Sequence, residues 1–228
     1  MLDLGLGGKV AIITGGSEGL GRAAAQQLAA EGARVAICAR RADVLERAAE
    51  NIRKAGGQVL ARPVDVTKAD PIEKFVGEVV GEWGGVDILV NNAGTSAAAS
   101  FESVNDDAWV HDLELKLLAA IRFCRLAIPH MKKRGGGRII NVTNLGAKAP
   151  TAGGLPTSVS RAAGINLTKS LSKEYAPDKI LVNTICIGLV KSGSGSAAPR
   201  ATSTPSTKTS PSACPSAASA KPRSSPTW

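Results

Sequence analysis

Residues 9–21 read KVAIITGGSEGLG and join a strand-like run to a glycine-rich turn. The apolar run at 9–14 predicts a buried strand, and the Ala-rich stretch at 20–31 predicts a helix after the turn. Glycine lets the backbone adopt positive φ and approach a ligand closely, and the start of a helix presents free N–H groups to a phosphate. The stretch therefore predicts a phosphate-binding strand–turn–helix unit, although a turn of this kind can also be purely structural.

Strand-like and helix-like stretches alternate along the chain beyond this unit. Strands that are apolar throughout are typical of parallel strands covered by helices on both faces. The pattern predicts a Rossmann-like, doubly wound parallel α/β sheet in three layers. The further expected strands are 33–39, 57–64, 86–92, 137–143 and 180–187, and the further expected helices are 42–55, 70–83, 108–133 and 157–175.

The net charge of +9 is unevenly distributed between a body and a tail. Residues 192–228 hold four basic residues and no acid, are rich in Ser, Thr and Pro, and lack Val, Ile, Leu, Met and Phe. Such a composition cannot bury enough apolar surface to offset the entropy of ordering. We expect a folded domain at 1–191, a disordered tail at 192–228 and no nucleic-acid partner.

Several other classes of protein are disfavoured. No apolar run approaches the ~20 residues of a membrane span, and the N-terminus lacks the pattern of a secretory signal. The cysteines, at positions 38, 124, 186 and 214, form no C-x-x-C pair, and the chain has only two histidines. We therefore expect no metal site, no membrane and a cytoplasmic location.

The residues after the second expected strand bear on the choice of nucleotide. Arg40 and Arg41 follow the small Ala39, where the ribose of an adenosine would lie, and arginine there favours a 2′-phosphate. This favours NADP, with NAD as the alternative. The negative charge of Glu18 argues against a phosphate in the glycine turn. The two arginines could also simply be solvated residues at the start of a helix.

Four motifs, in order, resemble those of the short-chain dehydrogenases/reductases. They are T-G-x-x-x-G-x-G at 14–21, Asp-Val at 65–66, N-N-A-G at 91–94 and V-N-x-x-x-P-G at 182–188, with Ile187 in place of proline. The resemblance covers residues 6 to about 193 and implies a dinucleotide-binding domain at 1–191, a small-molecule substrate, and homo-oligomers among intact relatives. The cofactor contacts that it implies are Thr14, Gly15, Ser17, Glu18, Gly19, Leu20, Gly21, Arg40, Asp65, Val66, Asn91, Ala93, Gly94, Arg161 and Gly188.

The catalytic positions implied by the resemblance carry other residues. The family's Tyr and Lys fall on Thr157 and Arg161, its Ser on Asn144 and its helix Asn on Lys116. An aliphatic hydroxyl is a far weaker acid than a phenol. The sole tyrosine, Tyr175, lies about 27 Å along the same helix at 1.5 Å per residue. The alternatives are an altered oxidoreductase site, in which Lys116 donates a proton, a lapsed site that only binds nucleotide, and a product without function.

The tail also suggests a frameshift. Read in a shifted frame with GC-rich leading bases, residues 207–228 can encode YEDLAKRMPLGRVGEAEEFADL, which resembles the family's sequence after the sixth strand. We hypothesise a one-base frameshift near Gly193, which would remove the seventh strand and leave the sixth as an uncovered edge. Sequencing the gene tests this: a second frame that does not encode this stretch would exclude it.

Overall fold

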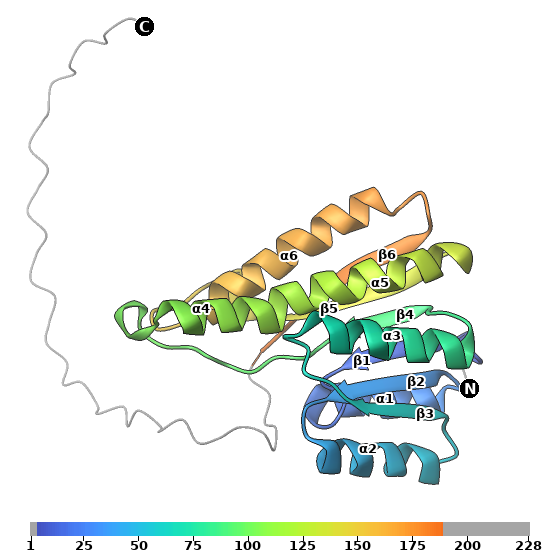
Figure 1. The fold of residues 1–228 in the computed structure, drawn as a ribbon. Coiled ribbons are helices and arrows are strands. Elements are labelled where there is room, and N and C mark those ends of the chain that lie inside the picture. Colours follow the sequence, from blue (N-terminus) through green and yellow to red (C-terminus); the bar gives the residue numbers. More distant parts are fainter. Residues whose placement is uncertain (1–3, 189–228) are drawn as a thin grey trace, which may run out of the picture. The chain divides into compact units, whose positions relative to one another are not determined.

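The computed structural model describes residues 4–188, so the tail and the position of the proposed frameshift lie outside the described residues. Its strands and helices alternate as expected (Figure 1). The strands are β1 Val10–Thr14, β2 Arg34–Ala39, β3 Val59–Pro63, β4 Ile88–Asn91, β5 Gly137–Asn144 and β6 Ile180–Ile187. The helices are α1 Gly19–Ala30, α2 Ala42–Lys54, α3 Ala69–Trp83, α4 Asp106–Leu113, α5 Ala119–Lys133 and α6 Thr157–Glu174, with short turns η1 Phe101–Ser103, η2 Glu114–Leu118 and η3 Leu145–Ala147.

The sheet of the described residues has six strands in the order β3-β2-β1-β4-β5-β6, and every pair is parallel. The order reverses between β1 and β4, where Ala11 pairs with Ile88. Ligands of open α/β sheets bind beyond the carboxyl ends of the strands at such a switch point. This confirms the doubly wound parallel sheet and places the glycine turn after β1 beside the N-N-A-G loop after β4.

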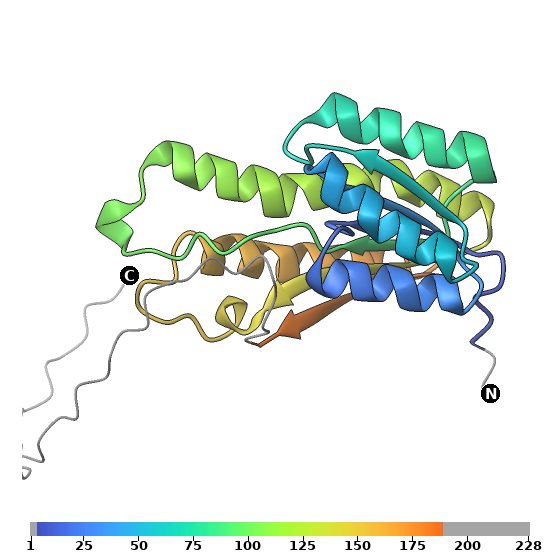
Figure 2. The same cartoon turned by 90° about the horizontal axis from the view of Figure 1, so that it is seen from below.

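Two apolar cores lie on opposite faces of the sheet. Alternate residues of β1 point to opposite faces of the sheet. Ile12 packs in the core with α3 and α5, while Ile13 packs in the core with α1 and α2. Figures 1 and 2 show the three layers, with α3, α5 and α6 on one side and α1 and α2 on the other. Burial on both faces explains why the strands read as continuous apolar runs.

The edge strand β6 is covered on one face only within residues 4–188. Ile180 and Val182 are buried, whereas Leu181 and Ile185 on the opposite face are 49% and 50% exposed. This agrees with the expected edge strand with an uncovered apolar face.

One expected element is divided. The predicted helix at 108–133 begins at Asp106 and contains the π-helical turn η2 between α4 and α5. Asn105 caps its start, because its side chain accepts a hydrogen bond from the backbone N–H of Ala108 at 3.0 Å. Lys116 lies in the π turn, and π turns inside α-helices are frequent at functional sites.

Candidate active site

The glycine-rich turn is held against β2 by its backbone. The N–H groups of Gly15 and Gly16 donate to the carbonyl oxygen of Cys38 at 2.8 and 3.2 Å. Gly15 and Gly19 have φ of +66° and +54°, where a side chain would be strained. A Cβ on Gly21 would overlap the carbonyl oxygen of Gly15, so α1 approaches the turn closely. The turn therefore requires glycine at these three positions and leaves the start of α1 open to a phosphate.

The loops after β1 and β4 are fastened together by Thr14 and Asn92. The Thr14 hydroxyl accepts the N–H groups of Asn92 and Ala93, both at 2.9 Å, and donates to the carbonyl of Val90 at 3.4 Å. The Asn92 amide donates to the carbonyls of Thr14 and Gly15 at 3.0 and 3.2 Å. Thr14, expected at the cofactor, thus uses its hydroxyl to position the turn, and Asn92 is a positioning residue absent from the expected site residues.

Charged groups gather beyond β2 and β3, at the expected adenosine end. Glu18 forms an ion pair with Arg41, so an arginine balances the charge of the acid in the glycine turn. Asp65 accepts the N–H and hydroxyl of Thr67 at 3.0 and 2.8 Å. Partial burial raises the pKa of Asp65, but the hydrogen bonds from Thr67 and the positive charge of Arg40 outweigh it and lower that pKa. Arg40 is exposed and free to meet an anion near Asp65.

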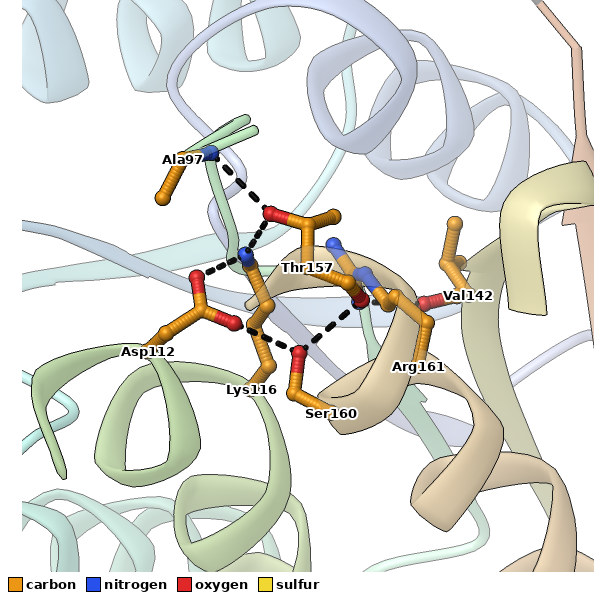
Figure 3. A network of polar contacts seen from close by, with 7 residues as sticks. All are labelled: Ala97, Asp112, Lys116, Val142, Thr157, Ser160 and Arg161. Atoms are coloured by element: carbon orange, nitrogen blue, oxygen red, sulfur yellow. Dashed lines mark hydrogen bonds and ion pairs between the residues drawn. The ribbon is translucent and has the colours of Figure 1, made fainter. Parts of the chain in front are cut away.

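Lys116 and Thr157 meet between η2 and the start of α6 (Figure 3). The Lys116 ammonium donates to the Thr157 hydroxyl oxygen at 2.9 Å and forms a buried ion pair with Asp112. The backbone N–H of Ala97 donates to the same hydroxyl oxygen at 3.0 Å. The side chains of Lys116 and Asp112 are only 1% and 2% exposed. The structure thus brings together two of the four expected catalytic positions.

Two further polar residues of this cluster were not expected from the sequence. Asp112 lies one turn before Lys116, and its second carboxylate oxygen accepts the Ser160 hydroxyl at 2.6 Å. The Ser160 hydroxyl also lies 3.1 Å from the carbonyl oxygen of Thr157. The only sequence signal was the four-residue spacing of Asp112 and Lys116, which more often marks a solvated pair on a helix surface.

The pKa of Lys116 reflects its surroundings. Burial lowers it most, the hydrogen bond and charge of Asp112 raise it, and the positive charge of Arg161 lowers it, so that the pKa lies below its usual value. Burial also lowers the pKa of Arg161, against the charge of Asp112. A lysine in such a place is suited to proton transfer.

The other two expected catalytic positions, Arg161 and Asn144, make no hydrogen bond to Lys116 or Thr157 within residues 4–188. The Arg161 guanidinium donates to the carbonyl of Val142 at 2.7 Å and packs so closely over Gly94 that a Cβ there would overlap it. Asn144 ends β5, and its side-chain oxygen is buried without a partner among the described residues. Arg161 therefore borders the N-N-A-G loop. The side-chain oxygen of Asn144 could still accept a hydrogen bond.

A small cavity of about 20 Å³ lies behind the cluster, between Lys116, Ser160, Arg161 and Asn91. The Asn91 amide nitrogen donates to the side-chain oxygen of Asn141 at 2.8 Å, while its own oxygen has no partner among the described residues. The side chain of Asn91, expected at the cofactor, thus turns into the protein, and only its backbone could face a ligand. Tyr175 follows α6 at the far end of that helix, with Lys132 5.1 Å from its ring centroid, so it takes no part in the site.

Comparison with known proteins identifies the family. A family model described as short chain dehydrogenase matches residues 9–202. Dehydrogenase/reductase SDR family member 4 of Homo sapiens is 35% identical over 187 residues, which cover 82% of this chain and 67% of that protein. The crystal structure of L-sorbose reductase from Gluconobacter frateurii, complexed with NADPH and L-sorbose, has a TM-score of 0.82 at 39% identity and covers 84% of this chain and 73% of its own.

The fold and the glycine turn at its switch point define a Rossmann-like α/β protein of the dinucleotide-binding class. The chain belongs to the short-chain dehydrogenase/reductase family, whose members are NAD(P)-dependent oxidoreductases. No helix within residues 4–188 is long and apolar enough to cross a membrane.

Proposed function

We propose that the protein reduces a carbonyl group with NADPH and protonates the substrate oxygen through Thr157 and Lys116. The observation that carries this proposal is the hydrogen bonding of the Thr157 hydroxyl. Its oxygen accepts two hydrogen bonds, from Lys116 and from the N–H of Ala97. A hydroxyl has two lone pairs and one proton, so the proton of Thr157 is left to donate to a further group.

The nucleotide end of the site fits a dinucleotide. The turn after β1 admits only glycine at its close approaches, and the start of α1 carries no side-chain cap. Arg40 supports a 2′-phosphate, and the neighbouring L-sorbose reductase was crystallised with NADPH. When bound, the nicotinamide supplies the hydride. The residues proposed to hold the cofactor are Gly15, Ser17, Glu18, Gly19, Leu20, Gly21, Arg40, Asp65, Val66, Ala93, Gly94, Arg161 and Gly188, with Thr14 and Asn91 contributing through their backbone.

The proton balance follows from the contacts. As the carbonyl carbon gains a hydride, its oxygen takes the proton of the Thr157 hydroxyl, and the Lys116 ammonium restores that proton across 2.9 Å. Lys116 becomes a neutral amine, and a proton from water recharges it after the alcohol leaves. Asn144 is proposed to donate its amide to the same substrate oxygen. Because Lys116 starts as an ammonium paired with Asp112, the site is poised as an acid, which favours reduction.

A catalytically lapsed protein that only binds nucleotide is the competing function. The weak acidity of an aliphatic hydroxyl favours it. NADPH binding without turnover of any aldehyde or ketone in a broad panel is the result that this second function predicts.

The test of catalysis uses Thr157→Val, which keeps the shape of the side chain and removes the hydroxyl. We expect turnover to fall by about 10²- to 10⁴-fold, the usual contribution of a general acid, while NADPH fluorescence titration gives an unchanged Kd. Ser172→Ala on the same helix is the matched control, because that hydroxyl bonds only the carbonyl of Lys169. Unchanged turnover in Thr157→Val contradicts the proposed role.

The test of the coenzyme uses Arg40→Ala. Loss of one charge-assisted hydrogen bond to a 2′-phosphate predicts an NADPH Kd about 10- to 150-fold higher, with the NADH Kd unchanged. Arg47→Ala is the control, because Arg47 is exposed on α2 and pairs with Asp43. Equal weakening of both coenzymes would argue against a 2′-phosphate contact.

A further inference from the structure

The cluster behind Lys116 contains the one acid that faces it. The charged groups facing the Lys116 ammonium are Asp112 from α4 and Arg161 from α6. The other residues that line the adjoining cavity are not ionisable. Asp112 attracts the ammonium where both side chains are buried, and Arg161, which is only partly buried, repels it. The charge state of Lys116 therefore depends on Asp112.

The carboxylate of Asp112 is fixed at both oxygens. One oxygen accepts Lys116 and the other accepts the Ser160 hydroxyl at 2.6 Å (Figure 3). Because Ser160 comes from α6, the carboxylate cannot turn away from Lys116 without losing a contact to a second helix. The same arrangement directs the ammonium toward Thr157, which stands at the start of α6.

Removing this acid would leave Lys116 buried with the Thr157 hydroxyl as a hydrogen-bond partner and, among the described residues, only the positive Arg161 as a charged neighbour. A buried ammonium without a counter-charge tends to lose its proton. A neutral amine could still lie beside Thr157, but it could not return a proton to that hydroxyl. Reduction would then require a lower pH.

We propose that Asp112 is a positioning residue that keeps Lys116 protonated and directed at Thr157, with Ser160 holding the carboxylate in place. This inference rests on the proposed reductase function and assigns a role to two residues outside the family motifs. Asp112 touches neither substrate nor cofactor and acts through Lys116.

The direct test measures the protonation of Lys116 in the full chain by heteronuclear NMR of the lysine side chains, with Lys116→Met to assign the signal. We expect Asp112→Asn to lower the pKa of Lys116 further, because the charge that holds the proton is gone. Asp112→Glu, which restores the charge, should recover most of this change. Asp107→Asn is the matched control, because Asp107 is an exposed acid on the same helix and should leave the titration unchanged. An unchanged pKa of Lys116 in Asp112→Asn overturns the inference.

The pH profile of kcat provides the second measurement. Reduction needs the ammonium, so its rate falls as pH rises through the pKa of Lys116, and in Asp112→Asn this fall should move to lower pH by the same interval as the NMR titration. A loss of rate without a shift of the profile would indicate a merely structural role and overturn the inference. If Asp112→Asn does not fold, Asp112→Ser removes the same charge with a smaller side chain. If the wild-type chain shows no turnover, the proposed function fails, while the NMR titration still decides whether Asp112 controls Lys116.

Discussion

The buried pair of Lys116 and Asp112 should show strong energetic coupling. In Lys116→Met, the Asp112 carboxylate remains buried with only Ser160 as a partner. In Asp112→Leu, Lys116 remains buried beside Arg161 without a counter-charge, so it must either carry an unpaired charge or give up its proton. Breaking a buried ion pair from one side costs about 3–5 kcal/mol. We expect each single variant to lose about this much free energy of unfolding.

In the double variant, the former partners of the pair, Thr157 and Ser160, keep other hydrogen bonds. Thr157 still accepts the N–H of Ala97, and the Ser160 hydroxyl can still donate to the carbonyl of Thr157 at 3.1 Å. Replacing both charges by apolar groups of similar volume is often neutral or stabilising. The double variant should therefore lie within about 2 kcal/mol of the wild type, which implies a coupling energy of at least about 4 kcal/mol.

Urea unfolding of the four proteins, followed by circular dichroism, measures this cycle. Asp43 and Arg47 provide the control, because they have the same four-residue spacing but are 68% and 65% exposed. Their coupling should be only about 0.3–0.5 kcal/mol. A double variant of Lys116 and Asp112 that loses the sum of the two single losses would refute the buried pairing.

Two other regions give sharp expectations. Gly21→Ala should lose NADPH binding and about 1–3 kcal/mol of stability, since its Cβ overlaps the glycine turn. Gly77→Ala, in open space on α3, should instead stabilise the protein by about 0.5–1 kcal/mol. Fluorescence titration measures NADPH binding and urea unfolding measures the stability of both variants. Burial raises the pKa of Cys38 and of Cys124 to about 12, so at pH 8 a thiol reagent followed by peptide mapping should label the partly exposed Cys186 and reach Cys38 and Cys124 only after unfolding. Labelling of Cys38 in the folded protein would contradict its burial.

The strands and most helices could be predicted from the sequence because the packing leaves a direct signature. The run at 9–14 contains β1, Val10–Thr14, since a buried parallel strand must be apolar along most of its length. The helix expected at 108–133 was wrong in detail, because a π turn changes the residues per turn without leaving a distinct pattern of apolar residues.

The candidate site was less accessible to sequence reasoning. Motif spacing led to Lys116 and Thr157, which the structure brings into contact, while their role in catalysis stays a prediction. Asp112 and Ser160 could not be found this way, because 48 residues separate them and only the packing of α4 against α6 brings them together. The ion pair of Glu18 in the glycine turn was also hidden from sequence reasoning, since its partner Arg41 lies 23 residues away in sequence.

The pairing of β1 with β4 imposes an order on folding. The first strand of the described residues lies in the middle of the sheet, and Val10 donates its N–H to the side chain of Asp87, 77 residues later, at 2.8 Å. During translation, residues 10–63 can assemble only the half-sheet of β1, β2 and β3, in which β1 is an edge that the finished sheet covers with β4. That edge remains available to a wrong strand until β4 emerges, because pairings between distant segments form slowly. Aggregation of a nascent chain is therefore expected to be greatest in the interval before residue 91 leaves the ribosome.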